Sequence, residues 1–254
     1  MAAFWLAVTG SLLSQVENSP RIEVQVGLQG WYAVPKGWLN ITLGSQPFTA
    51  THADIGSEIF LDPDAVPVLE GRLRLLGSQG FGLRVAQIDA AGTGTADESF
   101  TYHGDIFDAG RRVRSELDFR LLEGDYQFTA NPEDDLEVTA HVGAQVWSFS
   151  GRVKTVDAGP LLTTQRAFDS GFWMSGLDLS WKVGGGMELR ALAVGGFERA
   201  SQYFWKAEGD ALVRLGGSLS LTTGFRIHVI RFFQSTNQSN LKFFGPTMGV
   251  EISF

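Results

Sequence analysis

Two histidines and the carboxylates near them are the residues of this sequence whose types could support catalysis. His141 and His228 occupy polar positions of alternating segments, where Glu137, Asp210 or Glu251 could reach one of them. An imidazole beside a carboxylate has the geometry of a general base. Histidines among many charges are more often members of a polar network, so we expect no catalytic site and keep His141 and His228 only as candidates.

Two acidic stretches contain oxygen ligands of the kind that calcium prefers. ADIGSEIFLDPDAVP (53–67) and TADESFTYHGDIFDAG (95–110) hold four acidic residues each. Neither has the spacing of a defined metal loop. We therefore expect solvated loops, no bound metal and no cofactor.

Long β-strands must position all of these residues. Period-2 alternation recurs from residue 21 to the end of the chain, and helical periodicity is almost absent. We expect ten strands, with eight as the alternative, at 21–33, 67–77, 80–89, 111–129, 136–149, 171–184, 186–197, 202–216, 218–233 and 240–254. Several are long enough to cross a bilayer at a tilt.

The connections between these strands alternate between short and long. GSQG, NPEDD, GGG and GG are tight turns, whereas residues 34–66, 90–110 and 150–170 form long connections. This alternation is typical of a transmembrane up-and-down antiparallel β-barrel with short periplasmic turns and longer external loops. Residues 21–254 are then a single barrel domain, and an even strand number places both termini in the periplasm.

The polar faces of the strands carry charges of both signs, which we expect to line the lumen. The predicted lumen network consists of Arg72, Arg74, Arg114, Glu116, Asp118, Arg120, Asp178, Glu188, Arg190, Lys206, Glu208, Asp210, Arg214, Arg226 and Glu251. A ten-stranded barrel is only slightly wider than the eight-stranded kind, whose side chains fill the interior. We therefore expect a largely occluded, ion-paired lumen, with a narrow conduit for ions or small solutes as the alternative.

The strand at 111–129 changes phase once. Its apolar residues are odd-numbered up to Leu121 and even-numbered from Leu122 to Phe128. A β-bulge near Leu121–Glu123 would restore one lipid-facing side, and two shorter strands are the alternative.

Aromatic residues and the last strand complete the pattern. We expect a membrane-facing girdle of Trp173, Trp181, Tyr203, Trp205, Phe244 and Phe254. The ending FFGPTMGVEISF alternates strictly and closes on an aromatic residue. Pro246 cannot donate to the ladder, so a bulge or local gap is expected there.

These features together resemble Gram-negative outer-membrane β-barrel proteins. The N-terminal stretch MAAFWLAVTGSLLSQ, within residues 1–20, is similar to a signal peptide, with a retained peripheral segment as the alternative. The resemblance implies a location in the outer membrane, contacts with its lipid and lipopolysaccharide, and Phe254 as the signal read by the barrel-assembly machinery. Outer-membrane proteases of ten strands use acidic and histidine residues near the external rim, whereas Asp134 and Asp135 here lie in a turn at the opposite end.

Composition removes several other classes of function. The net charge of −8 argues against a nucleic-acid binder, and the absence of cysteine excludes disulfides and thiolate chemistry. The sequence therefore favours a non-enzymatic structural or surface-interaction barrel with acidic external loops and an envelope protein partner on its loops or outer wall. The alternatives are the narrow channel and a barrel hydrolase acting on envelope lipids or peptides.

Overall fold

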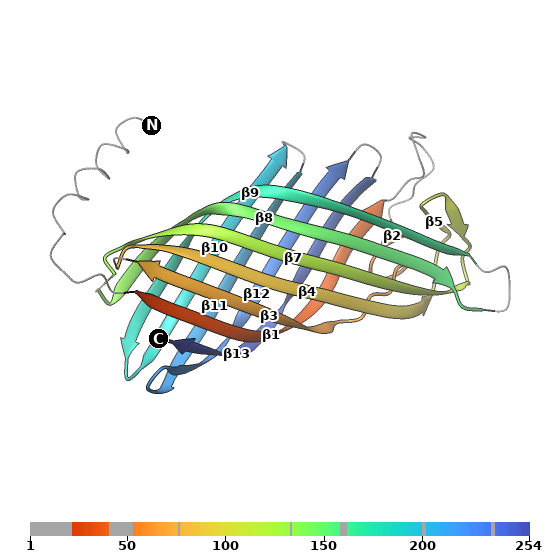
Figure 1. Ribbon diagram of the computed structural model, residues 1–254. Helices are drawn as coiled ribbons and strands as arrows, with labels where there is room; N and C mark the ends of the chain where they lie inside the picture. The colour runs from red at the N-terminus through yellow and green to blue at the C-terminus, as the bar shows by residue number, and fades with distance from the viewer. Residues whose placement is uncertain are drawn as a thin grey trace.

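The computed structural model describes residues 22–40, 53–75, 77–132, 134–157, 162–199, 202–234 and 237–254, which form a closed antiparallel β-barrel (Figure 1). Its strands are β1 (Glu23–Asn40), β3 (Asp64–Leu75), β4 (Gln79–Thr95), β7 (Arg112–Ala130), β8 (Leu136–Thr155), β9 (Thr163–Gly184), β10 (Met187–Arg199), β11 (Gln202–Gly216), β12 (Leu219–Gln234) and β13 (Asn237–Ser253). Each strand pairs with the next one, and β13 pairs with β1. The expectation of ten strands is confirmed, and the eight-stranded alternative is wrong. The segment 1–20 lies outside the described residues.

The barrel has two distinct ends. The turn end holds the four short connections, and there the first and last strands meet through Phe254 N donating to Val24 O at 2.9 Å. The loop end holds the two-residue strand β2 (Ala53–Asp54), which pairs with β1, and the hairpin of β5 (Phe100–Tyr102) and β6 (Asp105–Phe107). No helix in the described ranges is long and apolar enough to cross a membrane.

The outer surface is apolar over the turn half of the barrel and polar beyond it. On β1, outward residues from Val24 to Val34 are apolar or Gly, and Lys36 follows them. Ten residue steps of about 3.4 Å, at a tilt of about 40°, cover roughly 25 Å, which is the height of the apolar band of outer-membrane barrels. We call this band the apolar belt. Strands β4, β7, β8 and β9 extend farther, and β9 alone has 22 residues.

Strand β7 corrects the expected change of phase. It pairs with β4 and β8 in continuous register, so the bulge at Leu121–Glu123 and the two-strand alternative are both wrong. Odd-numbered residues face inward along most of its length, including buried Leu117 and Phe119. The strand keeps the same residues inward throughout, and it is the polarity of the two faces that changes. Beyond the apolar belt the outer face carries charged residues and the inner face carries apolar ones.

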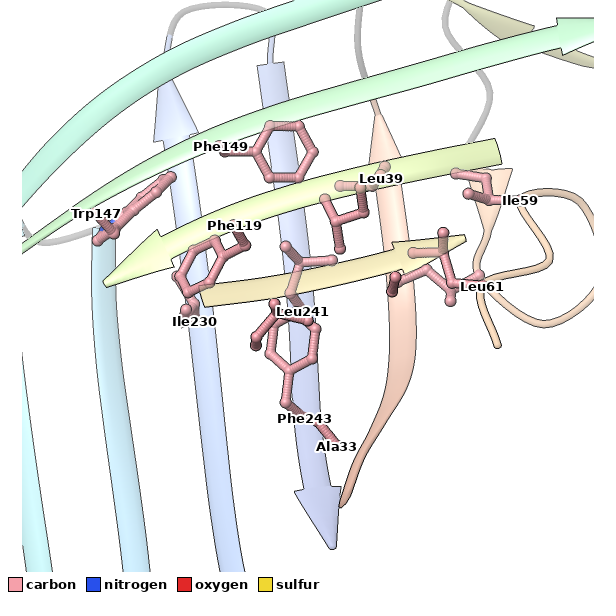
Figure 2. Packing of buried hydrophobic residues seen from close by; sticks show 14 of the residues in the cluster. Ala33, Leu39, Ile59, Leu61, Phe119, Trp147, Phe149, Ile230, Leu241 and Phe243 are labelled. Atoms are coloured by element: carbon pink, nitrogen blue, oxygen red, sulfur yellow. The ribbon is translucent and has the colours of Figure 1, made fainter. Parts of the chain in front are cut away.

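A hydrophobic core fills the loop half of the barrel (Figure 2). Phe119 lies at the centre of this core, with ring centroids 5.7 Å from both Trp147 and Phe243. Trp147 in turn stacks on Phe172 at 6.0 Å. Since four separate strands supply these rings, the aromatic core crosses the lumen from wall to wall.

The closing seam contains the predicted irregularity at Pro246. The β1–β13 pairing runs from Gln25↔Ser253 to Trp31↔Thr247 and resumes at Val34↔Phe244. The two intervening pairs are missing, while the register stays the same. A local gap is therefore confirmed, and the sheet closes without a bulge.

Candidate functional site

The structure places eleven of the fifteen predicted lumen charges inside the barrel and four outside. The inward ones are Arg72, Arg74, Asp178, Glu188, Arg190, Lys206, Glu208, Asp210, Arg214, Arg226 and Glu251. The prediction was wrong for four residues of β7, because the continuous register of this strand turns them to the outer wall. They are Arg114, Glu116, Asp118 and Arg120. There they form exposed ion pairs, such as Arg120 with Asp118 at 3.0 Å and Arg114 with Glu116 at 3.1 Å.

A buried ion-pair cluster spans the middle of the lumen. We call it the central lattice; its members are Glu70, Arg84, Glu123, Lys206, Glu208 and Arg226. Three cations face three carboxylates, so the formal charges cancel. Burial of unpaired charge would be very costly, and this mutual pairing is what permits so many ions inside the barrel.

The contacts of the central lattice join opposite walls. Arg84 Nη1 and Nη2 donate to the two carboxylate oxygens of Glu208 at 2.6 and 2.9 Å. Arg226 Nη2 donates to Glu70 at 3.0 Å and to Glu208 at 3.2 Å. Lys206 Nζ reaches Glu123 Oε2 at 2.7 Å from the other side of the barrel.

Sequence reasoning missed Glu123 as a lumen residue. Glu123 fell within the bulge expected at Leu121–Glu123, so it was assigned to neither face. Extending the phase of Leu122, Tyr126 and Phe128 as the lipid-facing set along the whole strand would have placed Glu123 inside.

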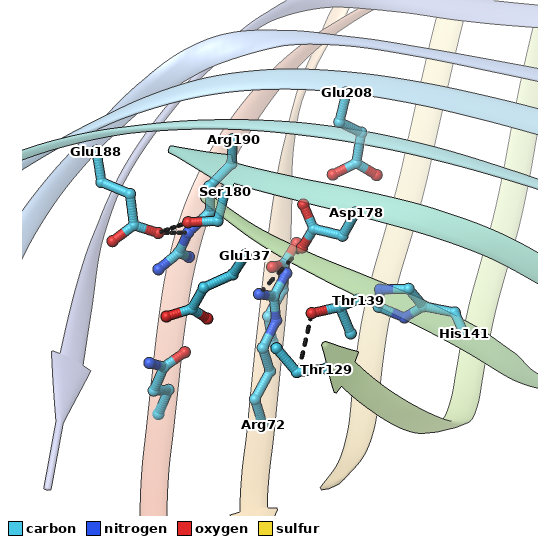
Figure 3. Close-up of polar contacts among 12 residues, drawn as sticks. Arg72, Thr129, Glu137, Thr139, His141, Asp178, Ser180, Glu188, Arg190 and Glu208 are labelled. Carbon is cyan, nitrogen blue, oxygen red and sulfur yellow. Dashed lines mark hydrogen bonds and ion pairs between the residues drawn. The ribbon is translucent and has the colours of Figure 1, made fainter. Parts of the chain in front are cut away.

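A charged vestibule lies between the central lattice and the turn end. It is a hollow of about 430 Å³ lined by residues from both the first and the last strands. Figure 3 shows Arg190 beside Glu188, to which it donates at 2.5 Å. Arg190 also donates to Glu251 at 2.7 Å. Glu137 accepts from Arg74 at 3.1 Å and from Lys182 at 2.8 Å. The vestibule is therefore an ordered set of ion pairs.

Both candidate histidines are buried, and neither uses a predicted carboxylate as its partner. His141 Nδ1 lies 2.6 Å from Asp125 Oδ2, and His228 packs edge-on to Phe204 at 5.8 Å. Asp210, by contrast, accepts from Thr247 Oγ1 at 3.1 Å. The Nε2 atoms of both histidines have no hydrogen-bond partner within the described ranges. The pair His141–Asp125 has the composition of a general base but no hydroxyl nucleophile bonded to it.

Two loops close the mouth at the loop end. Phe60 lies over Gly94 on β4, where an added Cβ would come within 2.2 Å of the phenyl ring. Tyr102 of the hairpin lies over Gly151 on β8, where an added Cβ would come within 2.5 Å of the hydroxyl oxygen. Glycine at these inward positions leaves room for the loop side chains inside the barrel wall.

Acidic residues of the loops are used in local contacts. Asp54 Oδ1 accepts from Gly56 N at 2.8 Å, and Asp105 accepts from the Thr164 hydroxyl. Asp157 accepts from Arg111 at 2.8 Å and from the Arg112 amide at 3.1 Å. These two contacts, with the hydrogen bond from the Arg112 amide the stronger influence, lower the pKa of Asp157. Among the described residues no group of three His, Asp or Glu side chains could hold a metal ion.

The predicted girdle residues face outward at the two edges of the apolar belt. Trp181 and Phe254 are exposed near the turn end, and Trp173 is 75% exposed toward the loop edge. Tyr203 and Trp205 are exposed on β11, and the ring of Phe244 lies beneath Lys36 Nζ at 5.3 Å.

Comparison with known proteins identifies the fold. No protein-family model matches the chain, and no curated protein matches it. The outer-membrane protease OmpT from Escherichia coli superposes with a TM-score of 0.61 at 10% identity, covering 95% of this chain and 100% of OmpT. Neisserial surface protein A superposes with a TM-score of 0.35 at 10% identity, covering 93% of this chain and 100% of that protein. The attachment invasion locus protein Ail of Yersinia pestis superposes with a TM-score of 0.39 at 8% identity, covering 92% of this chain and 99% of Ail. The closed ten-stranded sheet and the likeness to OmpT together show that this chain has the fold of an outer-membrane β-barrel protein.

Proposed function

We propose that this chain is an integral barrel of the outer membrane with a structural or surface-interaction role, and that its lumen stays closed. In this proposal the turn end and both termini face the periplasm, and the extended strands β4, β7, β8 and β9 stand outside the cell. The proposed partners are outer-membrane lipid and lipopolysaccharide, the assembly machinery that reads Phe254, and an envelope protein bound by the loops or outer wall.

One observation supports this proposal: two different fillings occupy the lumen in series. The central lattice blocks the middle with ion pairs such as Arg84–Glu208, and the aromatic core around Phe119 blocks the loop half. A permeating ion would have to separate buried ion pairs and then cross an apolar layer. Both steps oppose conduction, so the surface is the part of the molecule left to act.

An efflux assay tests the closed lumen. Purified full-length protein in liposomes loaded with potassium ions or arabinose should release neither faster than protein-free liposomes do. Protease protection of the turn end would verify that the barrels are inserted. Release of either solute in proportion to inserted protein would overturn the proposal and favour the narrow channel, for which the 430 Å³ vestibule would be the entrance.

The hydrolase alternative depends on the pair His141–Asp125. If the barrel cleaves envelope lipids or peptides with this pair, His141→Ala should abolish the activity while His228→Ala leaves it intact. We propose that neither substitution changes any hydrolysis measured with lipopolysaccharide or peptide substrates. Loss of an activity in the His141 variant alone would contradict the non-enzymatic role.

A further inference from the structure

Three basic side chains line the loop edge of the apolar belt on neighbouring strands. Lys36 on β1, Lys242 on β13 and Arg231 on β12 are all exposed on the outer wall. We call these three residues the cationic row.

The register of the sheet brings these charges together. Lys36 lies directly opposite Lys242 across the closing seam. Lys242 lies opposite Val229, two residues from Arg231 on β12. Like charges directly opposite each other destabilise an antiparallel pair, so the row has an electrostatic cost that an anion would remove.

Within the described ranges, no carboxylate forms an ion pair with any member of the cationic row. Lys154 and Arg152 on β8 of the same wall differ, since they approach Glu116 at 3.3 and 3.5 Å. The row is distinguished from these ion-paired residues by its unneutralised positive charge.

Aromatic rings lie against two members of the cationic row. Lys36 Nζ lies 5.3 Å from the ring centroid of Phe244, and the Arg231 guanidinium lies 5.9 Å from that of Tyr203. Both rings belong to the edge of the apolar belt, where aromatic residues meet the membrane interface. Apolar surface begins immediately below the cations, with Val34 on β1.

We propose that the cationic row binds a phosphate group of an outer-leaflet lipid, with the acyl chains of that lipid on the apolar belt beneath it. The phosphate neutralises the Lys36–Lys242 pair, and the belt contributes a contact that free phosphate could not make. This inference rests on the proposed membrane orientation and is independent of whether the lumen conducts. A leaky barrel that binds the lipid would refute the closed lumen alone, and a sealed barrel without lipid binding would refute this site alone.

Lipid binding to full-length protein in detergent micelles tests the site. The probes are diphosphoryl lipid A and the same lipid after enzymatic removal of its phosphates, with bound lipid measured by native mass spectrometry. The double variant Lys36→Gln/Lys242→Gln should bind diphosphoryl lipid A at least tenfold more weakly than the wild type. The matched control Arg152→Gln/Lys154→Gln loses the same charge on the same wall and should stay within twofold.

The dephosphorylated lipid should bind the wild type as weakly as diphosphoryl lipid A binds the Lys36/Lys242 double variant. An equal loss of affinity for diphosphoryl lipid A in the control variant would overturn the proposal. Unchanged affinity in the Lys36/Lys242 double variant would also overturn it. Inorganic phosphate that binds as tightly as the lipid would also overturn it, since the acyl chains would then contribute nothing.

A stability measurement keeps the test valid if the double variant folds poorly. The single variant Lys242→Gln removes the repulsion, so without lipid it should unfold at the same temperature as the wild type or a higher one. With diphosphoryl lipid A the order should reverse, because the lipid raises only the wild-type unfolding temperature strongly. An order that does not depend on lipid would contradict the site.

Discussion

At the scale of single residues, the central lattice depends on complete pairing. Glu208→Gln would leave Arg84 and Arg226 without their shared carboxylate in a buried position. Breaking a buried pair on one side costs about 3–5 kcal/mol, so we expect a loss of that order in the free energy of unfolding. Urea titration of the barrel in liposomes, followed by tryptophan fluorescence, measures it.

An exposed ion pair provides the control for this prediction. Asp118→Asn breaks the Arg120–Asp118 pair on the outer wall, where such pairs contribute about 0–1 kcal/mol. Equal losses in the Glu208 and Asp118 variants would show that the lumen is hydrated and that the central lattice is not buried from water.

Asp157 predicts a pH dependence confined to the loop end. Because its pKa is lowered in the folded protein, its contribution is complete above the ordinary value of 3.8 and is lost as pH falls through the lowered pKa. Contacts of Asp157 with Arg111 and Arg112 should thus persist from pH 7 to about pH 4 and weaken only below it. Hydrogen exchange at the Arg112 amide, corrected for its intrinsic rate, should show this, and Asp157→Asn should remove the pH dependence. A transition near neutral pH would contradict the assignment.

At the scale of elements, the loops at the mouth depend on glycine in the barrel wall. Gly151→Val would place side-chain atoms where Tyr102 now lies, so the β5–β6 hairpin should leave its position. We expect faster cleavage at Glu98 by a glutamate-specific protease in intact liposomes. Gly124→Val is the matched control, because an added Cβ there has no atom within 4 Å. Unchanged cleavage in the Gly151 variant would show that the hairpin does not depend on this contact.

The sequence predicted the ten strands and their turns because alternation is strong wherever one face meets lipid. The prediction was wrong in the loop half of the barrel, beyond the apolar belt, where neither face of a strand meets lipid. Strand β9 was expected from 171 but begins at Thr163, since its outer face there carries polar residues such as Gln165 and Asp169. Phe119 was assigned to lipid for the same reason, although it lies in the aromatic core. Hydrophobicity alone cannot tell a lipid-facing ring from one packed inside an aqueous extension.

The site was predictable in kind more than in detail. Opposite charges such as Arg190 and Glu251 were expected inside and do pair, at 2.7 Å. The partners across the lumen were not predictable, because they join strands far apart in the chain: Arg84 pairs with Glu208, 124 positions later. Such pairs follow from the closure of the barrel and the shear of its strands, which no local pattern contains.

At the scale of the whole molecule, the barrel combines two kinds of interior. Near the turn end it contains the charges of an outer-membrane lumen, and near the loop end it contains the apolar core of a soluble protein. The two fillings meet where the Arg226 guanidinium lies 5.5 Å from the ring centroid of Trp31, and each of them crosses the lumen. We therefore expect that removing one leaves the other to seal the lumen. In the proposed orientation, this arrangement would let the loop half stand beyond the bilayer as a rigid body.

Single-channel recording in planar bilayers tests the closed lumen most directly. We predict that the wild type, Glu208→Gln and Gly151→Val all insert without steady openings, because each keeps at least one of the two fillings. Insertion would be verified by recovering the heat-modifiable folded form from the same preparation. Steady, ohmic openings of the wild-type barrel would contradict the account.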